Sequence, residues 1–323
     1  MSQTATHSLP MILDEVEAVR VERLSPSFVR VELGGACLAD FGVAGPSYDQ
    51  RIKLVFPDGD GPLPSFAGAD ESWFGTWMER PVEERGHMRT YTLREVRGEG
   101  AATRLVVDFV IHVEDGEAGP GSSWAAGASV GDRVVLLAPR RGVEYGGIEF
   151  EPGSASRLLL AGDETAVPAI CAVLGQLPVS ATGAAFLEVP TSADVQTVPH
   201  PEGVEVVWLP REGEPVGSLL HPAVLAHLGA GPAPLVEPEE VDPDLWETPA
   251  YSSSGEEVES AVAVAGQDPS PGSGHRLDGL YAWIAGESGV VTALRRALVK
   301  DLGVDRRQVA FMGYWRRGVA MRS

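Results

Sequence analysis

Basic charge, cysteine and long apolar runs are all scarce in this 323-residue sequence. Asp and Glu number 46 against 25 Lys and Arg, and the formal net charge of −21 argues against general nucleic-acid binding and against attraction to anionic lipid. No apolar run reaches the roughly 18 residues of a transmembrane helix. The first ten residues lack the basic and apolar regions of a secretion signal. Only Lys53 and Lys300 are lysines.

Potential metal ligands are equally sparse. Cys37 and Cys171 are the only cysteines, so a four-thiolate site is impossible and one possible pair is weak evidence for a disulfide framework. The seven histidines are scattered without an H-x-x-x-H pair. We therefore expect a cytoplasmic protein without a resident metal, without nucleic-acid binding and without membrane insertion.

Residues 1–148 contain short strands separated by glycine and proline turns. Apolar and charged side chains alternate over residues 29–33, residues 105–111 repeat the alternation, and residues 132–137 follow a glycine turn. A period of two over several short segments predicts an antiparallel β-barrel or β-sandwich domain for residues 1–148.

Residues 149–323 follow a different pattern. A continuous apolar run at 157–161 is typical of a strand buried on both faces, and a helical apolar stripe follows it over 167–177. Strand and helix then alternate, which predicts an α/β domain with a parallel sheet. Further strands are expected at 184–189, 204–209, 280–285 and 308–312, with a helix at 291–302. Residues 230–278, rich in Pro, Glu and Ser, are interpreted as a partly disordered excursion from this domain.

Two segments of the first domain carry residue types that a flavin needs. On the strand Arg-Thr-Tyr-Thr, Arg89, Tyr91 and Thr92 supply a cation for phosphate, an aromatic face and a hydrogen-bonding group. The loop at 119–124, Gly-Pro-Gly-Ser-Ser-Trp, enters a helix and offers backbone N–H groups to a pyrophosphate. A surface strand and a plain helix cap are the competing interpretations.

Two strand–turn–helix junctions mark the second domain. Gly162–Thr165 and Gly286–Ser288 each follow an apolar strand, and such turns bind nucleotides at the carboxyl edge of open α/β sheets. Neither turn is G-x-G-x-x-G, so the turns alone do not establish a dinucleotide site. Tyr314 and Trp315, expected after the last strand, are interpreted either as a docked tail or as aromatics near the nicotinamide or flavin.

Together, the segments RTYTLR, DFVIH, GPGSSWA, GDETAVPAI, AWIAGES and GYWRRG resemble the siderophore-interacting protein family of the ferredoxin-reductase superfamily, over about residues 14–318. The resemblance implies an FAD-dependent ferric-siderophore reductase, with a flavin-binding barrel followed by a NAD(P)H-binding α/β domain. Two departures stand out. Gly121 replaces the alanine usual in the family's loop, which we interpret as a mild change, and the excursion is longer than in compact members.

The resemblance also implies residue roles. Arg89 pairs with an FAD phosphate, Tyr91 stacks on the isoalloxazine and Thr92 hydrogen-bonds near N5, the last two as catalytic residues. The other cofactor-binding residues implied are Asp108, Val110, His112, Gly119, Gly121, Ser122, Ser123 and Trp124 for FAD, and Gly162, Asp163, Glu164, Thr165, Gly286, Glu287, Ser288, Tyr314 and Trp315 for the nicotinamide side.

The strand at 184–189 bears on which nicotinamide is used, because the ribose of NAD(P)H is expected beyond its end. Glu188 offers a carboxylate to ribose hydroxyls, whereas a 2′-phosphate would require a cation and the nearest is Arg211. We therefore predict NADH over NADPH, both remaining candidates.

An anionic ferric siderophore would need a basic patch on so acidic a protein. Lys53, Arg140 and Arg316 are the candidates, with solvated surface charge as the alternative. A flavin is required because a hydride carries two electrons and Fe(III) accepts one. The alternative functions are a general NAD(P)H:flavin or ferredoxin-type reductase and a non-catalytic siderophore-binding protein. A monomer or weak dimer is expected.

Overall fold

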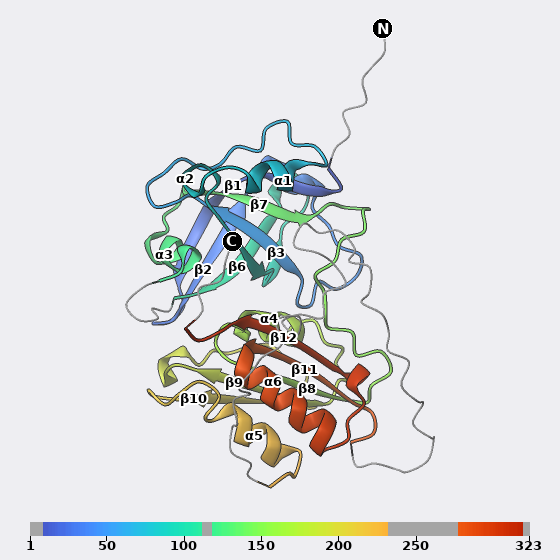
Figure 1. The fold of residues 1–323 in the computed structure, drawn as a ribbon. Helices are drawn as coiled ribbons and strands as arrows, with labels where there is room; N and C mark the ends of the chain where they lie inside the picture. The colour runs from blue at the N-terminus through green and yellow to red at the C-terminus, as the bar shows by residue number, and fades with distance from the viewer. Residues whose placement is uncertain (1–8, 112–117, 232–276, 319–323) are drawn as a thin grey trace. The chain divides into compact units, whose positions relative to one another are not determined.

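The computed structural model describes residues 9–111, 118–231 and 277–318 (Figure 1). The chain divides after Ile148 into two compact units, here called unit 1 and unit 2, each described by itself. His112 and almost all of the predicted excursion lie outside the described residues. Within the described parts, no helix has the length and apolar character needed to cross a membrane.

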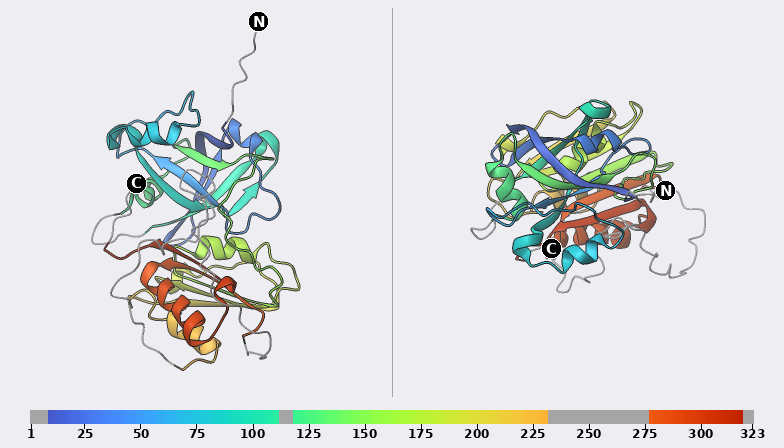
Figure 2. Two further views of the ribbon diagram at one scale, coloured as in Figure 1. Left: turned by 45° about the vertical axis from the view of Figure 1, so that its right-hand side comes forward. Right: turned by 90° about the horizontal axis from the view of Figure 1, so that it is seen from above.

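Unit 1 is built on one curled, seven-stranded antiparallel sheet in the order β4-β3-β7-β1-β2-β6-β5 (Figures 1 and 2). The predicted period of two is confirmed. Val31 and Val107 lie in the buried core, while Arg30 and Asp108 pair on the other face. The strands are β1 (Met11–Arg23), β2 (Phe28–Gly34), β3 (Arg51–Phe56), β4 (His87–Thr92), β5 (Glu95–Arg97), β6 (Arg104–Val110) and β7 (Arg133–Pro139).

Two short helices that the sequence pattern did not predict lie between β3 and β4. They are α1 (Trp73–Met78) and α2 (Val82–Arg85). Trp73 and Trp77 pack with Val55 and Val135 on the face of the sheet opposite the main core, and the Trp77 indole donates to the Arg85 carbonyl at 2.8 Å. This second core buries both faces of β3 and β7. A third helix, α3 (Pro120–Gly127), packs against the main core through Ala125.

Unit 2 contains a five-stranded parallel sheet in the order β10-β9-β8-β11-β12. The first strand in the sequence is therefore central, and the strand order reverses between β8 and β11. All five predicted strands are present: β8 (Arg157–Gly162), β9 (Gly183–Val189), β10 (Val204–Pro210), β11 (Leu280–Glu287) and β12 (Val309–Trp315). The helices are α4 (Val167–Leu174), α5 (Leu220–His227) and α6 (Ser288–Arg296).

Unit 2 differs from the sequence prediction near the chain end. β12 continues to Trp315, whose backbone pairs with Glu287 of β11, so Tyr314 and Trp315 belong to the last strand and not to a tail after it. The helix predicted to reach residue 302 is α6 followed by a π-helical turn at Ala297–Asp301. Helix α5 was not predicted.

Candidate functional site

Four aromatic rings surround the expected flavin strand of unit 1. The Tyr91 ring lies 4.6 Å from Phe109 and 5.9 Å from Phe56, measured between ring centroids. Trp124 of α3 lies 5.4 Å from Phe56 and 5.6 Å from Phe109. Burial raises the pKa of the Tyr91 hydroxyl, with Arg89 opposing the shift. Tyr91 therefore keeps its hydroxyl proton and offers a neutral aromatic surface.

Gly121 lies directly beneath the Tyr91 hydroxyl. A Cβ atom at position 121 would stand 1.7 Å from Tyr91 Oη and 2.9 Å from its Cζ, which no alanine could occupy without displacing the ring. The replacement of the family's alanine by Gly121 is thus more than a mild change in this chain. It permits a close approach of Tyr91 to the first turn of α3 that an alanine would prevent.

The residues around Tyr91 fit the needs of an FAD. Burial lowers the pKa of the Arg89 guanidinium, which donates to the Met88 carbonyl at 2.8 Å. Thr92 is buried, Gly119 caps α3, and Ser122 and Ser123 lie in its first turn. The first turn of a helix presents N–H groups without intrahelical partners, which suits a pyrophosphate. A cation, an aromatic face and the start of a helix thus lie beside Tyr91, as a bound FAD would require.

Asp108 and Val110 do not belong to this group. Phe109 faces the aromatic cluster, so its neighbours on β6 point to the opposite face. Asp108 accepts two hydrogen bonds of 2.7 Å from Arg30, with Arg94 at 3.7 Å. The structure places Asp108 in a buried ion pair of the sheet and not beside Tyr91.

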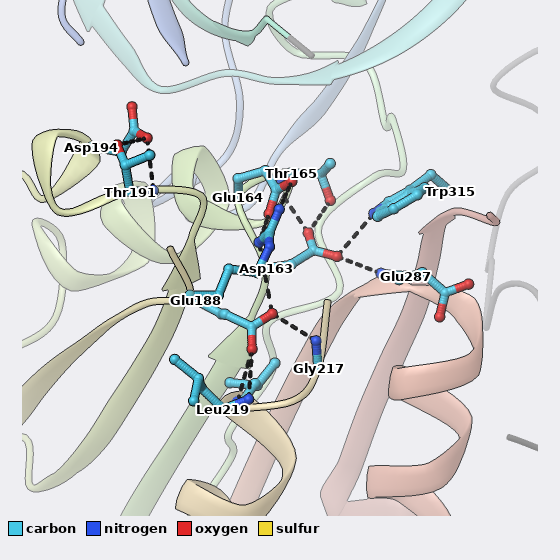
Figure 3. Close-up of polar contacts among 12 residues, drawn as sticks. Asp163, Glu164, Thr165, Glu188, Thr191, Asp194, Gly217, Leu219, Glu287 and Trp315 are labelled. Carbon is cyan, nitrogen blue, oxygen red and sulfur yellow. Dashed lines mark hydrogen bonds and ion pairs between the residues drawn. The ribbon is translucent and has the colours of Figure 1, made fainter. Parts of the chain in front are cut away.

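The carboxyl edge of the unit 2 sheet gathers the predicted turn residues (Figure 3). Asp163 Oδ1 accepts from the Thr165 backbone N–H at 2.9 Å and hydroxyl at 2.5 Å. Asp163 Oδ2 accepts from the Glu287 N–H at 2.6 Å and from the Trp315 indole at 2.9 Å. Gly286, at φ +139°, presses against this carboxylate, since a Cβ there would lie 2.6 Å from Oδ2. One carboxylate therefore joins the ends of β8, β11 and β12.

Glu164 and Glu188 share a single guanidinium. Arg211 donates to both oxygens of Glu164, at 2.6 and 2.8 Å, and its Nη1 lies 3.7 Å from Glu188 Oε2. Both carboxylates are buried, and the Arg211 pKa is raised by these partners against the effect of its own burial. The cation that was considered for a 2′-phosphate is thus held inside an ion-pair network.

Glu188 itself is fully buried, and its carboxylate is fully hydrogen-bonded to backbone N–H groups. Its oxygens accept the N–H groups of Gly217 at 2.7 Å and of Leu219 and Leu220 at 3.0 Å, so it caps the start of α5 (Figure 3). The sequence interpretation placed Glu188 at the ribose hydroxyls, but the geometry gives its carboxylate a structural role. The backbone groups that Glu188 binds lie some thirty residues away in the chain, and no local sequence motif predicts the contact.

The end of β12 is anchored at three points. Besides the indole bond to Asp163, the Ser288 hydroxyl donates to the Trp315 carbonyl at 2.8 Å, and the Arg317 N–H donates to Glu287 Oε1 at 3.3 Å. Glu287 Oε2 meanwhile accepts from Gly289 and Val290 in the first turn of α6. Trp315 is thereby held at the same edge as the two glycine turns.

The three candidate substrate cations have different surroundings. Lys53 donates to the Thr90 hydroxyl at 3.0 Å, on the face of the sheet opposite Ile52 and Tyr91. Arg140 contacts the Leu9 and Met11 carbonyls and Asp40, and so ties down the start of β1. Arg316 is half-buried after β12. Across the described residues, no group of three His, Cys, Asp or Glu side chains is arranged for a metal ion.

The fold and the matching family models define the class of the protein. An antiparallel sheet followed by a parallel sheet with its strand order reversing at the centre gives the chain a ferredoxin-reductase-like fold, as in the ferredoxin reductase of carbazole 1,9a-dioxygenase. Residues 17–143 match the model of the siderophore-interacting FAD-binding domain, and residues 155–318 match that of the siderophore-interacting protein. The chain belongs to the siderophore-interacting protein family.

Individual relatives match along most of the chain. The ferric vibriobactin reductase ViuB of Vibrio cholerae is 29% identical over 98% of this chain and 93% of its own. An NADPH-dependent ferric-chelate reductase of Escherichia coli is 30% identical over 64% of this chain and 74% of its own. The crystal structure of a siderophore utilization protein from T. fusca superposes with a TM-score of 0.63 at 29% identity, covering 96% of this chain and 95% of that one.

Proposed function

We propose that this chain is an FAD-dependent oxidoreductase that takes electrons from NAD(P)H and delivers them to Fe(III) held by a siderophore. The observation that carries the proposal is the group around Tyr91, which lies in the region matching the siderophore-interacting FAD-binding domain. The names of the Vibrio cholerae and Escherichia coli relatives, both ferric reductases, support the same reaction.

In this proposal, residues of unit 1 bind FAD and residues of unit 2 bind NAD(P)H. Bound FAD supplies the conversion of a two-electron donor into one-electron reduction of iron. Arg89 neutralises phosphate charge, Tyr91 provides a packing face, and Thr92 offers a hydroxyl within the strand. At the edge of unit 2, the turns at Gly162–Thr165 and Gly286–Ser288 receive NAD(P)H, because nucleotides bind where the strand order of such a sheet reverses.

A direct experiment follows electrons from donor to iron. The flavin of the purified holoprotein is reduced anaerobically with NAD(P)H, and its reoxidation is recorded with a panel of ferric siderophores while ferrozine traps Fe(II). Rapid reoxidation with stoichiometric Fe(II) is expected. Binding of ferric siderophores without reoxidation would instead identify a carrier, and reoxidation only by free flavin or an iron–sulfur protein would identify a general reductase.

The substrate is expected to be recognised through its negative charge, with Lys53, Arg140 and Arg316 as candidate contacts. Lys53 gives the sharpest test because the other lysine, Lys300, lies exposed in unit 2 and serves as a matched control. Lys53→Ala should raise KM for an anionic ferric siderophore several-fold, whereas Lys300→Ala should leave it unchanged. Equal KM values for all three proteins would remove Lys53 from the substrate site.

A preference for NADH is proposed on the ground that Arg211 is already engaged by Glu164 and Glu188. A 2′-phosphate would have to compete with two buried carboxylates for that cation. The name of the Escherichia coli relative specifies NADPH and favours the opposite choice. Comparing kcat/KM for NADH and NADPH decides between them. A preference for NADPH would mean that either Arg211, despite its two carboxylates, or the Arg316–Arg317 pair reads the phosphate.

A cytoplasmic location and a monomeric or weakly dimeric state remain predictions. Analytical ultracentrifugation of the holoprotein over a tenfold concentration range tests the second.

A further inference from the structure

The carboxylate of Asp163 lies at the point where the unit 2 sheet reverses its strand order. β8 ends at Gly162, directly before it, and the N–H of Glu287 at the end of β11 donates to it at 2.6 Å (Figure 3). The side chain is 1% exposed, and the Trp315 indole closes over it from β12. Asp163 is thus a buried ionisable group at the place where a nucleotide is expected.

The charges around Asp163 do not balance. Glu164 on its own turn and Glu188 on β9 are both buried, and their shared cation, Arg211, gives two hydrogen bonds to Glu164. Glu287 on β11 adds a further carboxylate, whose oxygens accept backbone N–H groups of α6 and of Arg317. In the parts of the chain that the structure describes, Asp163 has no ion-pair partner, and the cation whose charge reaches it, Arg211, is bonded to Glu164.

A buried carboxylate without a cation is costly, and binding a proton relieves that cost. Burial, followed by the charge of Glu164, raises the pKa of Asp163 to about 7, against the hydrogen bonds from Thr165, Trp315 and Glu287. Asp163 therefore binds a proton far more readily than an exposed aspartate does.

The hydrogen-bond geometry accommodates either protonation state. A proton on Oδ1 would point at the Thr165 hydroxyl, 2.5 Å away, which can turn from donor to acceptor. Oδ2 would remain an acceptor for Trp315 and Glu287 in both states. Protonation thus changes the charge of the edge while the ends of β8, β11 and β12 stay joined.

We propose that Asp163 takes up a proton when a nicotinamide dinucleotide binds, so that proton binding and nucleotide binding strengthen one another. The inference rests on the proposed function in one respect, namely that the carboxyl edge of unit 2 receives the dinucleotide. The diphosphate brings negative charge toward a carboxylate that has no ion-pair partner, since Arg211 is bonded to Glu164, and this charge favours the protonated form. By linkage, protonated Asp163 binds the dinucleotide more tightly by the same factor.

Calorimetric titration of the holoprotein with NAD⁺ tests this without turnover. The diphosphate of NAD⁺ carries no group that titrates between pH 6 and 8, whereas a 2′-phosphate has a pKa of about 6. Titrations in buffers of different ionisation enthalpy count the protons exchanged. We expect uptake of a fraction of a proton near pH 7.5, and a Kd that rises by up to about tenfold from pH 7 to 9. NADP⁺ is titrated in parallel. Because its 2′-phosphate also exchanges protons, the uptake that NADP⁺ causes in Asp163→Asn is subtracted from the uptake that it causes in the wild type.

Three variants test whether Asp163 is the group that takes up the proton. Asp163→Asn should abolish both the proton uptake and the pH dependence of Kd. Asp194→Asn is the matched control, because Asp194 is also a buried carboxylate of unit 2 that accepts from a nearby threonine, Thr191, and its uptake should equal that of the wild type. Trp315→Phe removes one donor to Asp163 and should move the uptake to higher pH, which keeps the test valid should Asp163→Asn fail to fold.

Three results would overturn the inference. Nucleotide binding without proton uptake, or uptake that persists in Asp163→Asn, would contradict it while leaving the proposed function intact. Failure of NAD⁺ and NADP⁺ to bind at any pH would contradict the proposed use of this edge, and the inference with it.

Discussion

The aromatic cluster at Tyr91 and the carboxyl edge of unit 2 are organised by different forces. At Tyr91, four rings and Gly121 fix a shape, and the ionisable groups are few. At the carboxyl edge, four carboxylates and Arg211 fix the ends of strands through charge and hydrogen bonds. The first site should therefore be sensitive to changes of side-chain volume, and the second to changes of charge and pH.

The largest expected effect comes from breaking the charge network. Glu188→Ala leaves Arg211 with one carboxylate fewer and exposes three N–H groups at the start of α5 to a cavity. We expect the free energy of unfolding to fall by about 3 kcal/mol, measured by urea denaturation. Glu205→Ala on exposed β10 surface is the control and should change it little. A loss below about 1 kcal/mol for Glu188→Ala would mean that water replaces the carboxylate without difficulty.

The next effect comes from adding volume at the aromatic cluster. Gly121→Ala places a methyl group where the Tyr91 hydroxyl lies, and overpacking of this kind costs about 1–3 kcal/mol. We also expect weaker FAD retention and a shifted flavin spectrum, because Tyr91 must move.

Two further variants test that interpretation of Gly121. Gly127→Ala, in the same helix with open space around it, should be silent. Adding Tyr91→Phe to Gly121→Ala should restore part of the loss by removing the clashing oxygen. An unchanged spectrum and stability in Gly121→Ala would show that Tyr91 relaxes without cost.

The difference between the two regions also explains what the sequence could predict. The strands of both units follow from local periodicity. The pairing of Arg30 with Asp108, which lie opposite one another on β2 and β6, was not predicted, and the sequence assigned Asp108 to FAD instead. The turn residues of unit 2 were found because they follow apolar strands. Local pattern was enough wherever one element determines which way a side chain points.

The features that escaped prediction depend on contacts between distant segments. Glu188 meets the start of α5, and Arg211 meets Glu164, across intervals with no repeating spacing. Helix α5 is short and contains Pro222 in its first turn, so its apolar pattern is weak. The role of Gly121 depends on the position of one ring from another strand.

A more gradual effect, spread over several pH units, is expected from the ionisation of Asp163. Its pKa is raised from 3.8 to about 7, so between those values the folded protein binds more protons than the unfolded chain. The stability that Asp163 contributes is therefore full at low pH and is lost as pH rises toward 7. The stability difference between wild type and Asp163→Asn, followed by denaturation from pH 5 to 8, should change by at most about 1.4 kcal/mol per pH unit. A constant difference would show that Asp163 does not titrate in this range.

The smallest effect should come from charge at the surface. Arg133 pairs with Glu15 at 3.4 Å, and both side chains are about half exposed. Arg133→Ala should change the free energy of unfolding by less than about 0.5 kcal/mol, because exposed ion pairs contribute little. Arg30→Ala removes the ion-pair partner at 2.7 Å from the buried Asp108 and provides the contrast. It should lower the free energy of unfolding several times more than Arg133→Ala does. Equal losses for the two would mean that burial does not govern these pairs.

The central position of β8 has a consequence for folding during synthesis. β8 pairs with β11, whose residues are synthesised about 120 residues later, as with Arg157 and Leu280. Until β11 leaves the ribosome, the apolar strand Arg157–Gly162 has β9 on one side and an open hydrogen-bonding edge on the other. Open apolar edges invite pairing with other chains, and contacts this distant in sequence form slowly. Unit 1 can complete its sheet co-translationally, whereas the sheet of unit 2 stays open at β8 until its fourth strand arrives.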